Sequence, residues 1–371
     1  MTSDWKWTGP AEPMLHAVSG LRERGHTADL ACPAPPDGVQ GALLERARAR
    51  GVEPVLELER GQGYHPWNDR GTVRALRERI ASGRYDVVHV HHTRDHLLAR
   101  VGTWRTRTPL VASWHHGHAI PARFWNRWLY GPRGCDALTL LSAALAQDAQ
   151  ALGGAAGRLA VVPGVVDTEL FAPRERSPRV LEELGLTADE CVIGVVARLQ
   201  PHRRFELLLE AFRIAQRKAP QLKLVVVGRG TRAHQVLEEP VQRLGLGTHV
   251  IRAGYRSGDY RDILALFHAL VFLVPGSDGS CRAVLEAMAI GIPVIASKRG
   301  VLPETVDDGV TGELVDEEPE ALARAFVRCA RDPADWQRRG KAARERALVR
   351  HRIELQAERL EALYRSLVAT A

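Results

Sequence analysis

The strongest constraint on the fold is an alternation of short runs rich in Val and Ile with longer amphipathic stretches, which begins near residue 85. Runs such as CVIGVVAR (191–198) and LKLVVVG (222–228) are typical of strands buried on both faces of a parallel sheet. Stretches such as PHRRFELLLEAFRIAQRK (201–218) have the apolar spacing of amphipathic helices. This alternation predicts an α/β fold with parallel sheets.

The predicted strands fall into two successive series, which predict two doubly wound, Rossmann-like domains. They are residues 86–92, 110–116, 137–142, 159–164, 191–198, 222–228, 249–254, 270–276 and 292–297. A chain of 371 residues is long enough for two cores, and the charged, proline-containing segment 171–190 is the best linker. The tail 333–371 has the pattern of two or three helices without a strand. We therefore predict an N-terminal domain at 1–172, a second domain at 173–350 and a last helix at 351–371.

The N-terminus does not fit this scheme. A doubly wound domain should open with a strand, but residues 9–26 have the pattern of a loop and a helix, which leaves only MTSDWKWT before them. Either the true start lies upstream of Met1, or this short segment is the first strand. We favour the upstream start, and residues 2–7 paired in the middle of the first sheet would contradict it.

Composition narrows the classes of function. The formal net charge is +7 and comes almost wholly from arginine, but no RNP, helix-turn-helix or zinc-finger pattern accompanies it, so no nucleic-acid partner is expected. The five cysteines are scattered without a CxxC pair, which argues against a zinc site and favours a reducing, cytoplasmic location. No apolar run is long enough to span a bilayer, and no signal-peptide pattern is visible.

Three charged residues stand in the otherwise apolar or small stretch 272–297: Asp278, Arg282 and Glu286. We expect a strand to end near Gly276, a loop to follow, and a buried helix to begin near Cys281 with Ser280 as its N-cap. Arg282 and Glu286, four residues apart, share the polar face of this helix. Either they form an ion pair, or Arg282 faces an anionic ligand at the helix N-terminus. Asp278 is either a turn residue or a second ligand-binding carboxylate.

Six segments together resemble the retaining nucleotide-sugar glycosyltransferases of family 4. The resemblance covers nearly the whole chain in the family's order, through GPAEPML (9–15), LVASWHH (110–116), VVPGVVDTELFAP (161–173), VVARLQPHRRFELLLEAF (195–212), DGSCRAVLEAMAIGIPVIAS (278–297) and LPETVDDGVTGELVD (302–316). It implies a GT-B fold, in which two Rossmann-like domains face a central cleft and the last helix crosses back to the first domain. Residues 352–369 are the candidate for that helix.

The resemblance also implies roles for individual residues. Glu286 would hold the ribose hydroxyls of the donor, Asp278 would contact the transferred sugar, and Arg198 and Arg203 would clamp the diphosphate. His115 would point toward the reacting carbon. The remaining donor-site candidates are the main chain of Gly9 and the residues Ser280, Cys281 and Arg282. Arg204 is the alternative to Arg203 at the family's lysine position, and His116 is a less suitable alternative to His115.

The implied reaction moves a sugar from a nucleoside diphosphate to an unidentified acceptor, such as a glycolipid, lipopolysaccharide or another cell-surface glycan, with retention of configuration. We expect no metal and no cofactor beyond the donor, because HVHHTRDH (89–96) has the pattern of a strand end and a loop rather than of three or four convergent ligands. No protein nucleophile is evident, so we expect the acceptor to attack on the face from which the phosphate departs.

Other functions stay open on the sequence. VVVGRGTRA (225–233) matches the GxGxxA pattern of dinucleotide-binding oxidoreductases, but the next strand lacks an acidic residue at its end. A GT-B epimerase or phosphorylase, or a non-catalytic protein that only binds nucleotide sugars, would carry similar motifs.

The segment ARFWNRWLYGPR (122–133) interleaves arginines with aromatic residues. It is either a helix packed in the core with its arginines in solvent or a surface that contacts an acceptor or an anionic membrane. The candidates for such a surface are Arg123, Trp125, Arg127 and Trp128, and they would place the protein peripherally at the inner face of the membrane.

Overall fold

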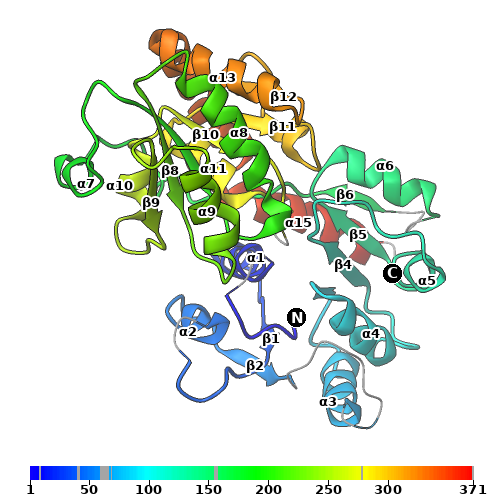
Figure 1. The fold of residues 1–371 in the computed structure, drawn as a ribbon. Coiled ribbons are helices and arrows are strands. Elements are labelled where there is room, and N and C mark those ends of the chain that lie inside the picture. Colours follow the sequence, from blue (N-terminus) through cyan, green and yellow to red (C-terminus); the bar gives the residue numbers. More distant parts are fainter. Residues whose placement is uncertain are drawn as a thin grey trace. The chain divides into compact units, whose positions relative to one another are not determined.

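In a computed structural model that describes residues 1–7, 10–39, 42–58, 67, 69–153, 158–276 and 279–369, the chain forms two α/β units (Figure 1). Unit 1 comprises Met1–Val165, Ser277–Ser280 and Ile353–Ala371, and unit 2 comprises Val166–Gly276 and Cys281–Arg352. The division falls between Val165 and Val166, earlier than the predicted boundary at 172, and the segment 171–190 lies within unit 2.

All nine predicted strands are present, and every strand pair in the described sheets is parallel, which confirms the predicted α/β class. Three further strands, β1, β2 and β12, were missed. Strand β1 has three residues, and every residue of β2 keeps some exposure, so neither forms a long apolar run. Strand β12 is a four-residue edge strand. Short or partly exposed strands lack the apolar pattern on which the prediction depended.

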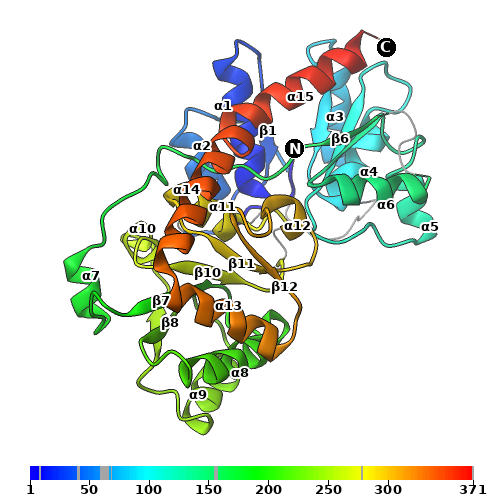
Figure 2. The same cartoon turned by 90° about the horizontal axis from the view of Figure 1, so that it is seen from above.

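Unit 2 is built on one six-stranded sheet with the order β12-β11-β10-β7-β8-β9. Its strands are β7 (Cys191–Val196), β8 (Leu222–Val227), β9 (Val250–Gly254), β10 (Ala269–Phe272), β11 (Val294–Ser297) and β12 (Gly312–Val315). Its helices are α7 (Pro178–Glu183), α8 (Phe205–Gln216), α9 (Glu239–Arg243), α10 (Tyr260–Leu264), α11 (Arg282–Ile290), α12 (Leu302–Thr305), α13 (Pro319–Arg331) and α14 (Pro333–Arg350), with short turns at Pro201–Arg203 and His234–Glu238. Helix α8 packs against α13 and α11 packs against α14, and the two pairs cover opposite faces of the sheet (Figure 2).

Unit 1 contains a two-stranded sheet, β1-β2, and a four-stranded sheet, β3-β4-β5-β6. The strands are β1 (Leu30–Cys32), β2 (Pro54–Glu57), β3 (Val88–Val90), β4 (Leu110–Trp114), β5 (Ala137–Leu140) and β6 (Leu159–Val161). The helices are α1 (Ala11–Glu23), α2 (Leu43–Arg48), α3 (Arg70–Ala81), α4 (Thr93–Gly102), α5 (Phe124–Leu129), α6 (Ala143–Ala151) and the last helix, α15 (Ile353–Val368).

Helix α15 belongs to unit 1 although it follows unit 2 in the chain, and it packs along α1 (Figure 2). The two helices approach closely because Gly20 of α1 has no side chain. A Cβ at position 20 would lie 2.8 Å from the Cβ of Ala357. The buried residues Leu360, Leu363 and Leu367 extend the apolar contact of α15 along the unit.

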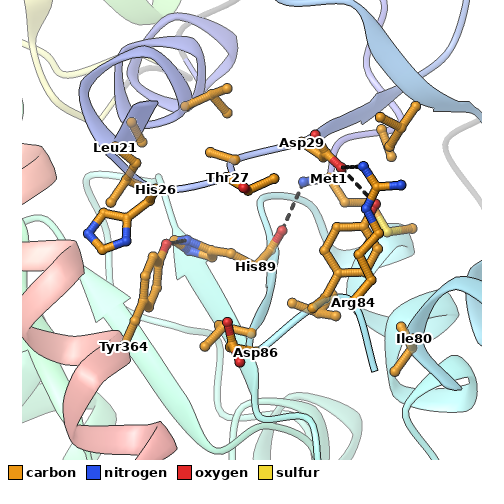
Figure 3. Close-up of a pocket in the computed structure, with 18 of the residues that line it drawn as sticks. Met1, Leu21, His26, Thr27, Asp29, Ile80, Arg84, Asp86, His89 and Tyr364 are labelled. Carbon is orange, nitrogen blue, oxygen red and sulfur yellow. Dashed lines mark hydrogen bonds and ion pairs between the residues drawn. The ribbon is translucent and has the colours of Figure 1, made fainter. Parts of the chain in front are cut away.

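The first residues lie between the two sheets of unit 1 without forming a strand. The Met1 amine donates a hydrogen bond to the carbonyl of His89 in β3 at 2.8 Å. The Thr2 N–H donates to the carbonyl of Ala31 in β1 at 2.9 Å. Each of these two residues therefore contacts a different sheet. Met1 and His89 are among the residues that line a cavity of about 860 Å³ between β1 and β3 (Figure 3).

The close approach of α1 and α15 predicts that Gly20→Leu lowers the free energy of unfolding of unit 1 by about 1–3 kcal/mol, because the larger side chain separates the helices. Gly71→Ala on α3 is the matched control, since its Cβ would meet nothing within 4 Å. This control should raise the free energy by about 0.5–1 kcal/mol through helix propensity. Thermal unfolding followed by circular dichroism measures both, and an unchanged midpoint for Gly20→Leu would contradict the packing.

Candidate functional site

The sheet of unit 2 changes its winding direction between two central strands. From β7 the chain moves outward through β8 and β9, then returns to β10 on the other side of β7 and continues through β11 and β12. Loops that follow such a central pair diverge and leave room at the carboxyl ends of the strands, where ligands of doubly wound folds bind. The candidate arginines follow β7, and the stretch that leads to Glu286 follows β10.

Arg203 is held beside the carboxyl end of β10. Its Nη1 donates a hydrogen bond to the carbonyl of Val274 at 2.7 Å. A Cβ at Gly276 would lie 2.1 Å from Nη2 of Arg203, so the guanidinium lies directly against the glycine backbone. Arg198, in the loop that leaves β7, is exposed. The structure thus brings Arg203 to the loop that follows β10 and leaves Arg198 at the surface of the same end of the sheet.

Arg204 has different surroundings. Its Nε lies 2.7 Å from Glu206 and its Nη1 lies 2.9 Å from Glu317, so its charge is paired with two carboxylates. Its backbone is left-handed, with φ at 60° and ψ at 37°. Glycine favours this conformation. Arg203 and Arg204 thus differ in structure: Arg204 is paired with carboxylates on a left-handed backbone, whereas Arg203 contacts the carbonyl of Val274.

Helix α11 begins one residue later than predicted. Cys281, not Ser280, is the N-cap, and it is buried with φ at 53° and ψ at 48°. A left-handed N-cap with a thiol cannot provide the usual Ser or Thr cap, and the side chains of the two N-cap residues, Cys281 of α11 and Arg204 of α8, make no capping hydrogen bond. Gly291 ends α11 in the left-handed conformation. Both helices start at the ligand end of the sheet, where the positive end of a helix dipole favours an anion.

Glu286 is buried on α11, with an exposed fraction of 8%. The Tyr260 hydroxyl of α10 donates a hydrogen bond to its Oε2 at 2.7 Å. Nε of Arg282 lies 3.9 Å from its Oε1, which is an ion pair but longer than a hydrogen bond. The predicted pairing of Arg282 with Glu286 is thus present in loose form. Tyr260 was missed by the sequence analysis because no motif links it to a residue on another helix.

Two of the predicted site residues, Asp278 and Gly9, lie outside the described residues. The next residue after Asp278, Gly279, belongs to unit 1 and donates a backbone hydrogen bond to the carbonyl of His115 at 2.9 Å. A Cβ at position 279 would lie 2.2 Å from the backbone nitrogen of Gly117. Glycine is therefore required for this contact, which brings the segment 279–280 to the carboxyl end of β4.

His115 stands at the end of a row of three histidines in unit 1. Its Nε2 shares a hydrogen bond with Nδ1 of His91 at 2.9 Å, and their rings stack with centroids 5.2 Å apart. The ring of His89 stacks on that of His91 at 4.4 Å. The ring of His89 is fixed by Ser113 at 2.7 Å and by Tyr364 of α15 at 2.5 Å. The alternative candidate, His116, is exposed and stacks on His118 instead.

Burial keeps this row uncharged. It lowers the pKa of His115 to about 3, with a smaller effect of the neighbouring His92 and His116. Burial also lowers the pKa of His89 and of His91 well below the ordinary value. At pH 7 the row is therefore neutral and acts through hydrogen bonds. The sequence analysis interpreted His89 and His91 only as part of a strand end and missed their link to His115.

Within the described residues, no group of three or more His, Cys, Asp or Glu side chains is arranged to hold a metal ion. The histidines of β3 instead bind hydroxyl groups and one another.

The glycines of the GxGxxA motif serve the packing of the chain itself. A Cβ at Gly228 would lie 2.0 Å from the carbonyl oxygen of Ala197, and a Cβ at Gly230 would lie 2.2 Å from that of Leu199. The loop after β8 thus lies directly on the segment that leaves β7. This contact accounts for both glycines without a dinucleotide.

Helix α5 presents two aromatic side chains to solvent. Phe124 is 77% exposed and Trp125 is 69% exposed, while Trp128 is partly buried and Leu129 and Tyr130 are buried. The interpretation that this segment packs wholly in the core is therefore wrong for its first turn. Arg123 and Arg127 are exposed beside these rings.

None of the described helices is both long and apolar enough to cross a membrane.

Comparisons with known proteins match both halves of the chain. A family model described as Glycosyltransferase Family 4 matches residues 11–170, and one described as Glycosyl transferases group 1 matches residues 178–346. The GDP-mannose-dependent alpha-(1-6)-phosphatidylinositol monomannoside mannosyltransferase of Mycolicibacterium smegmatis is 31% identical over 326 residues, which are 81% of this chain and 83% of that protein. The D-inositol 3-phosphate glycosyltransferase of Kribbella flavida is 31% identical over 304 residues, 74% and 69% of the two chains. Among solved structures, Anabaena HepE in complex with UDP has a TM-score of 0.80, 21% identity and 98% coverage of both chains.

The buried histidines predict a loss of stability on mild acidification. An unfolded histidine takes up a proton near its ordinary pKa of about 6.5, whereas folded His115 does so only near pH 3, so stability falls as the pH drops through this window. At pH 5 the loss from His115 is about 2 kcal/mol. His115→Gln should therefore show a smaller fall of the melting temperature between pH 7 and pH 5.

Thermal unfolding at constant ionic strength measures this difference. The titration of Glu361 does not affect this comparison above pH 5. Hydrogen bonds from Arg24, Arg365 and His26 lower the pKa of Glu361 to about 2, so its contribution to stability is lost only below about pH 4.5. An identical pH profile for the wild type and His115→Gln would contradict the assignment of a neutral His115.

Proposed function

Because the chain belongs to the family 4 glycosyltransferases and has their GT-B fold, we propose that it transfers a sugar from a nucleoside diphosphate sugar to a glycolipid or another cell-surface glycan, with retention of configuration and without a metal ion.

The observation that carries this proposal is the set of groups at the carboxyl ends of β7 and β10. Arg203 is fixed against Gly276, Arg198 is exposed at the same end of the sheet, and Arg282 stands in the first turn of α11. The starts of α8 and α11 add the positive ends of two helix dipoles. Together they provide cations and dipoles for a diphosphate, whose negative charge grows as the sugar leaves.

Glu286 is the ribose-binding group in this proposal. A carboxylate accepts hydrogen bonds from two neighbouring hydroxyls, and Tyr260 already holds one of its oxygens in place. Glu286 is buried at the ligand end of the sheet, where hydrogen bonds are stronger than in water. The hydroxyls of a bound ribose would donate hydrogen bonds to its carboxylate in place of water. Arg282 lies in the first turn of α11, with its Nε 3.9 Å from Oε1 of Glu286, and would contact a phosphate of the donor in this proposal.

The proposed transfer breaks the bond between the anomeric carbon and the diphosphate oxygen and forms a bond between that carbon and the acceptor oxygen. The acceptor hydroxyl gives its proton to the departing phosphate oxygen on the same face of the sugar, so no protein nucleophile is needed. Arg198 and Arg203 stabilise the diphosphate as its charge develops, and Asp278 contacts the sugar hydroxyls. No step requires a metal when arginines supply the positive charge.

His115 acts as a neutral hydrogen-bonding group in this scheme. Its low pKa excludes a charged imidazolium at neutral pH, so it would orient the sugar or stabilise the reacting carbon through its ring. His91 is a positioning residue, because its Nδ1 shares the hydrogen bond with Nε2 of His115. Gly279 supports the same site by its backbone bond to His115.

The proposed acceptor is a lipid-linked glycan at an anionic membrane. The relative from M. smegmatis is named for transfer to a phosphatidylinositol monomannoside. The exposed Phe124 and Trp125 of α5, with Arg123 and Arg127 beside them, have the combination of apolar rings and cations that interfacial helices use. All five cysteines are buried and none forms a disulfide, which supports a reducing cytoplasmic location at the inner face of the membrane.

The proposed donor site predicts that substitution of Arg203 lowers turnover strongly and that substitution of the neighbouring Arg204 does not. Arg203→Ala, like Arg198→Ala, should lower the turnover of the correct donor by about 10²–10³-fold, because it removes a charge from the leaving diphosphate. Arg204→Gly should keep turnover within about threefold, since position 204 needs only a left-handed backbone. Release of nucleoside diphosphate from a panel of GDP- and UDP-sugars measures these effects, and circular dichroism checks the fold of each variant.

Equal losses for Arg203→Ala and Arg204→Gly would overturn the choice of Arg203. The same assay tests the reaction class: turnover should persist in EDTA, and the product should keep the anomeric configuration of the donor by NMR. Isomerisation of the nucleotide sugar without an acceptor would instead identify an epimerase, and the absence of turnover with every donor would favour a protein that only binds.

The α5 surface predicts salt-sensitive membrane binding. The wild type should sediment with vesicles that contain about 30% anionic lipid at low salt, and Trp125→Ala should weaken this binding several-fold. Trp104→Ala is the matched control, because Trp104 is also an exposed tryptophan of unit 1, at 51%, but stands at the end of α4. Binding that is equally reduced in both variants, or absent in the wild type, would remove the membrane proposal.

A further inference from the structure

The second half of the motif VVPGVVDTELFAP (161–173) forms a turn in unit 2, directly after the boundary between the two units. Oδ1 of Asp167 accepts a hydrogen bond from the backbone N–H of Leu170 at 2.8 Å. The carbonyl of Asp167 accepts another from the N–H of Phe171 at 2.9 Å. An aspartate that bonds to its own backbone in this way fixes a turn. The conformation of the turn 167–171 is therefore set within the motif itself.

Arg344 of α14 joins this turn to α11. Its Nη1 donates hydrogen bonds to the carbonyl of Thr168 at 2.9 Å and to the carbonyl of Ala289 at 2.8 Å. Thr168 is buried in the turn, and Ala289 lies on α11, three residues after Glu286. Nη1 of a guanidinium carries two N–H groups, so one atom holds both carbonyls. The turn therefore has a fixed position relative to the helix that carries Glu286.

Two arginines bind the same turn to α10. Nη1 of Arg261 on α10 donates a hydrogen bond to the carbonyl of Leu170 at 2.9 Å. Nη1 of Arg174, which follows the turn, lies 2.6 Å from Oδ1 of Asp262 on α10. Contacts as exposed as these contribute little to stability on their own. Their effect is on position, since they keep α10 beside the turn.

In this position Phe171 contacts Tyr260, the first residue of α10. The two rings meet edge to face, with centroids 6.3 Å apart and an angle of 78° between the ring planes. This geometry places the positive edge of one ring against the negative face of the other, which favours one orientation. The Tyr260 hydroxyl donates a hydrogen bond to Oε2 of Glu286 at 2.7 Å. The contacts thus continue from the turn through two aromatic rings to the carboxylate.

The orientation of Glu286 matters because a carboxylate can accept from two neighbouring hydroxyls only when it faces both of them. Binding groups need to be held within about 0.5 Å and 10–20° of their working geometry. The Tyr260 hydroxyl holds one oxygen of Glu286, but its own position depends on the rotamer of the tyrosine. Phe171 restrains that rotamer from a different segment of the chain.

We propose that Phe171 is a positioning residue for nucleotide binding. Its ring holds Tyr260 so that the Tyr260 hydroxyl fixes the carboxylate of Glu286 toward the two hydroxyls of a ribose. This inference rests on the proposed function, in which Glu286 binds the ribose of the donor. It gives the turn 167–171 a role in selecting ribonucleotides over nucleotides that lack the ribose hydroxyls.

The test measures how strongly each variant of the full chain distinguishes a ribonucleotide from its 2′,3′-dideoxy form. Isothermal titration calorimetry gives the Kd of GDP, UDP and ADP and, for the one that binds most tightly, the Kd of its dideoxy form. The dideoxy form should bind the wild type at least about 30-fold more weakly, because hydrogen bonds to a charged carboxylate are lost. Phe171→Leu should lower this ratio about three- to tenfold, and Tyr260→Phe should lower it about tenfold.

The double variant Phe171→Leu/Tyr260→Phe separates positioning from a general loss of structure. Its ratio should equal that of Tyr260→Phe within about twofold, because no hydroxyl is left to position. Losses that multiply in the double variant would overturn the proposal, since Phe171 would then act by another route. Leu170→Ala is the matched control and should keep the wild-type ratio, because the Leu170 side chain is exposed on the same turn.

A wild-type ratio for Phe171→Leu would overturn this proposal and leave the proposed function intact. A ratio near one for the wild type, or no binding of any of the three nucleotides, would instead overturn the ribose assignment of Glu286 and this inference with it. Circular dichroism checks the fold of each variant. If Phe171→Leu does not fold, Phe171→Met takes its place with the same expected ratios.

Discussion

The parallel pairing of β7 with β10 is the constraint on which the candidate donor site depends. It involves only Ala269 with Ile193 and Leu270 with Gly194. Gly194 makes it possible, because a Cβ there would lie 2.0 Å from the buried ring of Phe267, which precedes β10. Once the two strands are adjacent, the loop that contains Arg203 and the loop that leads to α11 must leave the sheet side by side. The position of Arg203 beside that loop is therefore a consequence of strand order.

In unit 1, the candidate site residue His115 is held in place by contacts with other aromatic rings. In the described part of the chain, His115 stands at the end of a row of rings that includes His91 and His89, and the His89 ring is hydrogen-bonded to Tyr364. Tyr364 lies on α15, so the last helix of the chain supports a histidine of the first unit. Neutral rings in this partly buried row keep their orientation without the desolvation penalty of buried charges. This arrangement connects the packing of α1 and α15 with the orientation of His115.

The sequence predicted the elements that carry a strong local pattern. The nine strands rich in Val and Ile and helix α11 were predicted correctly, because burial leaves a continuous apolar run. The prediction was wrong where the local pattern was short or ambiguous. Ser280 has the usual chemistry of an N-cap, but the backbone turns at Cys281 instead. Phe124 and Trp125 have helical spacing, yet they face solvent, since spacing does not say which side of a short helix meets the core.

The sequence by itself determined the parallel α/β class, the family and the identity of the charged residues at the ends of β7 and β10, since these depend on local periodicity and on motifs read along the chain. Only the tertiary structure gave Arg203 and Arg204 different surroundings, joined Tyr260 to Glu286 and His91 to His115, and left a cavity between β1 and β3. Arg203 and Arg204 are adjacent and chemically identical, so only the left-handed backbone at 204 and the carbonyl of Val274 distinguish them. Contacts of this kind join residues far apart in the chain, and no periodicity encodes them.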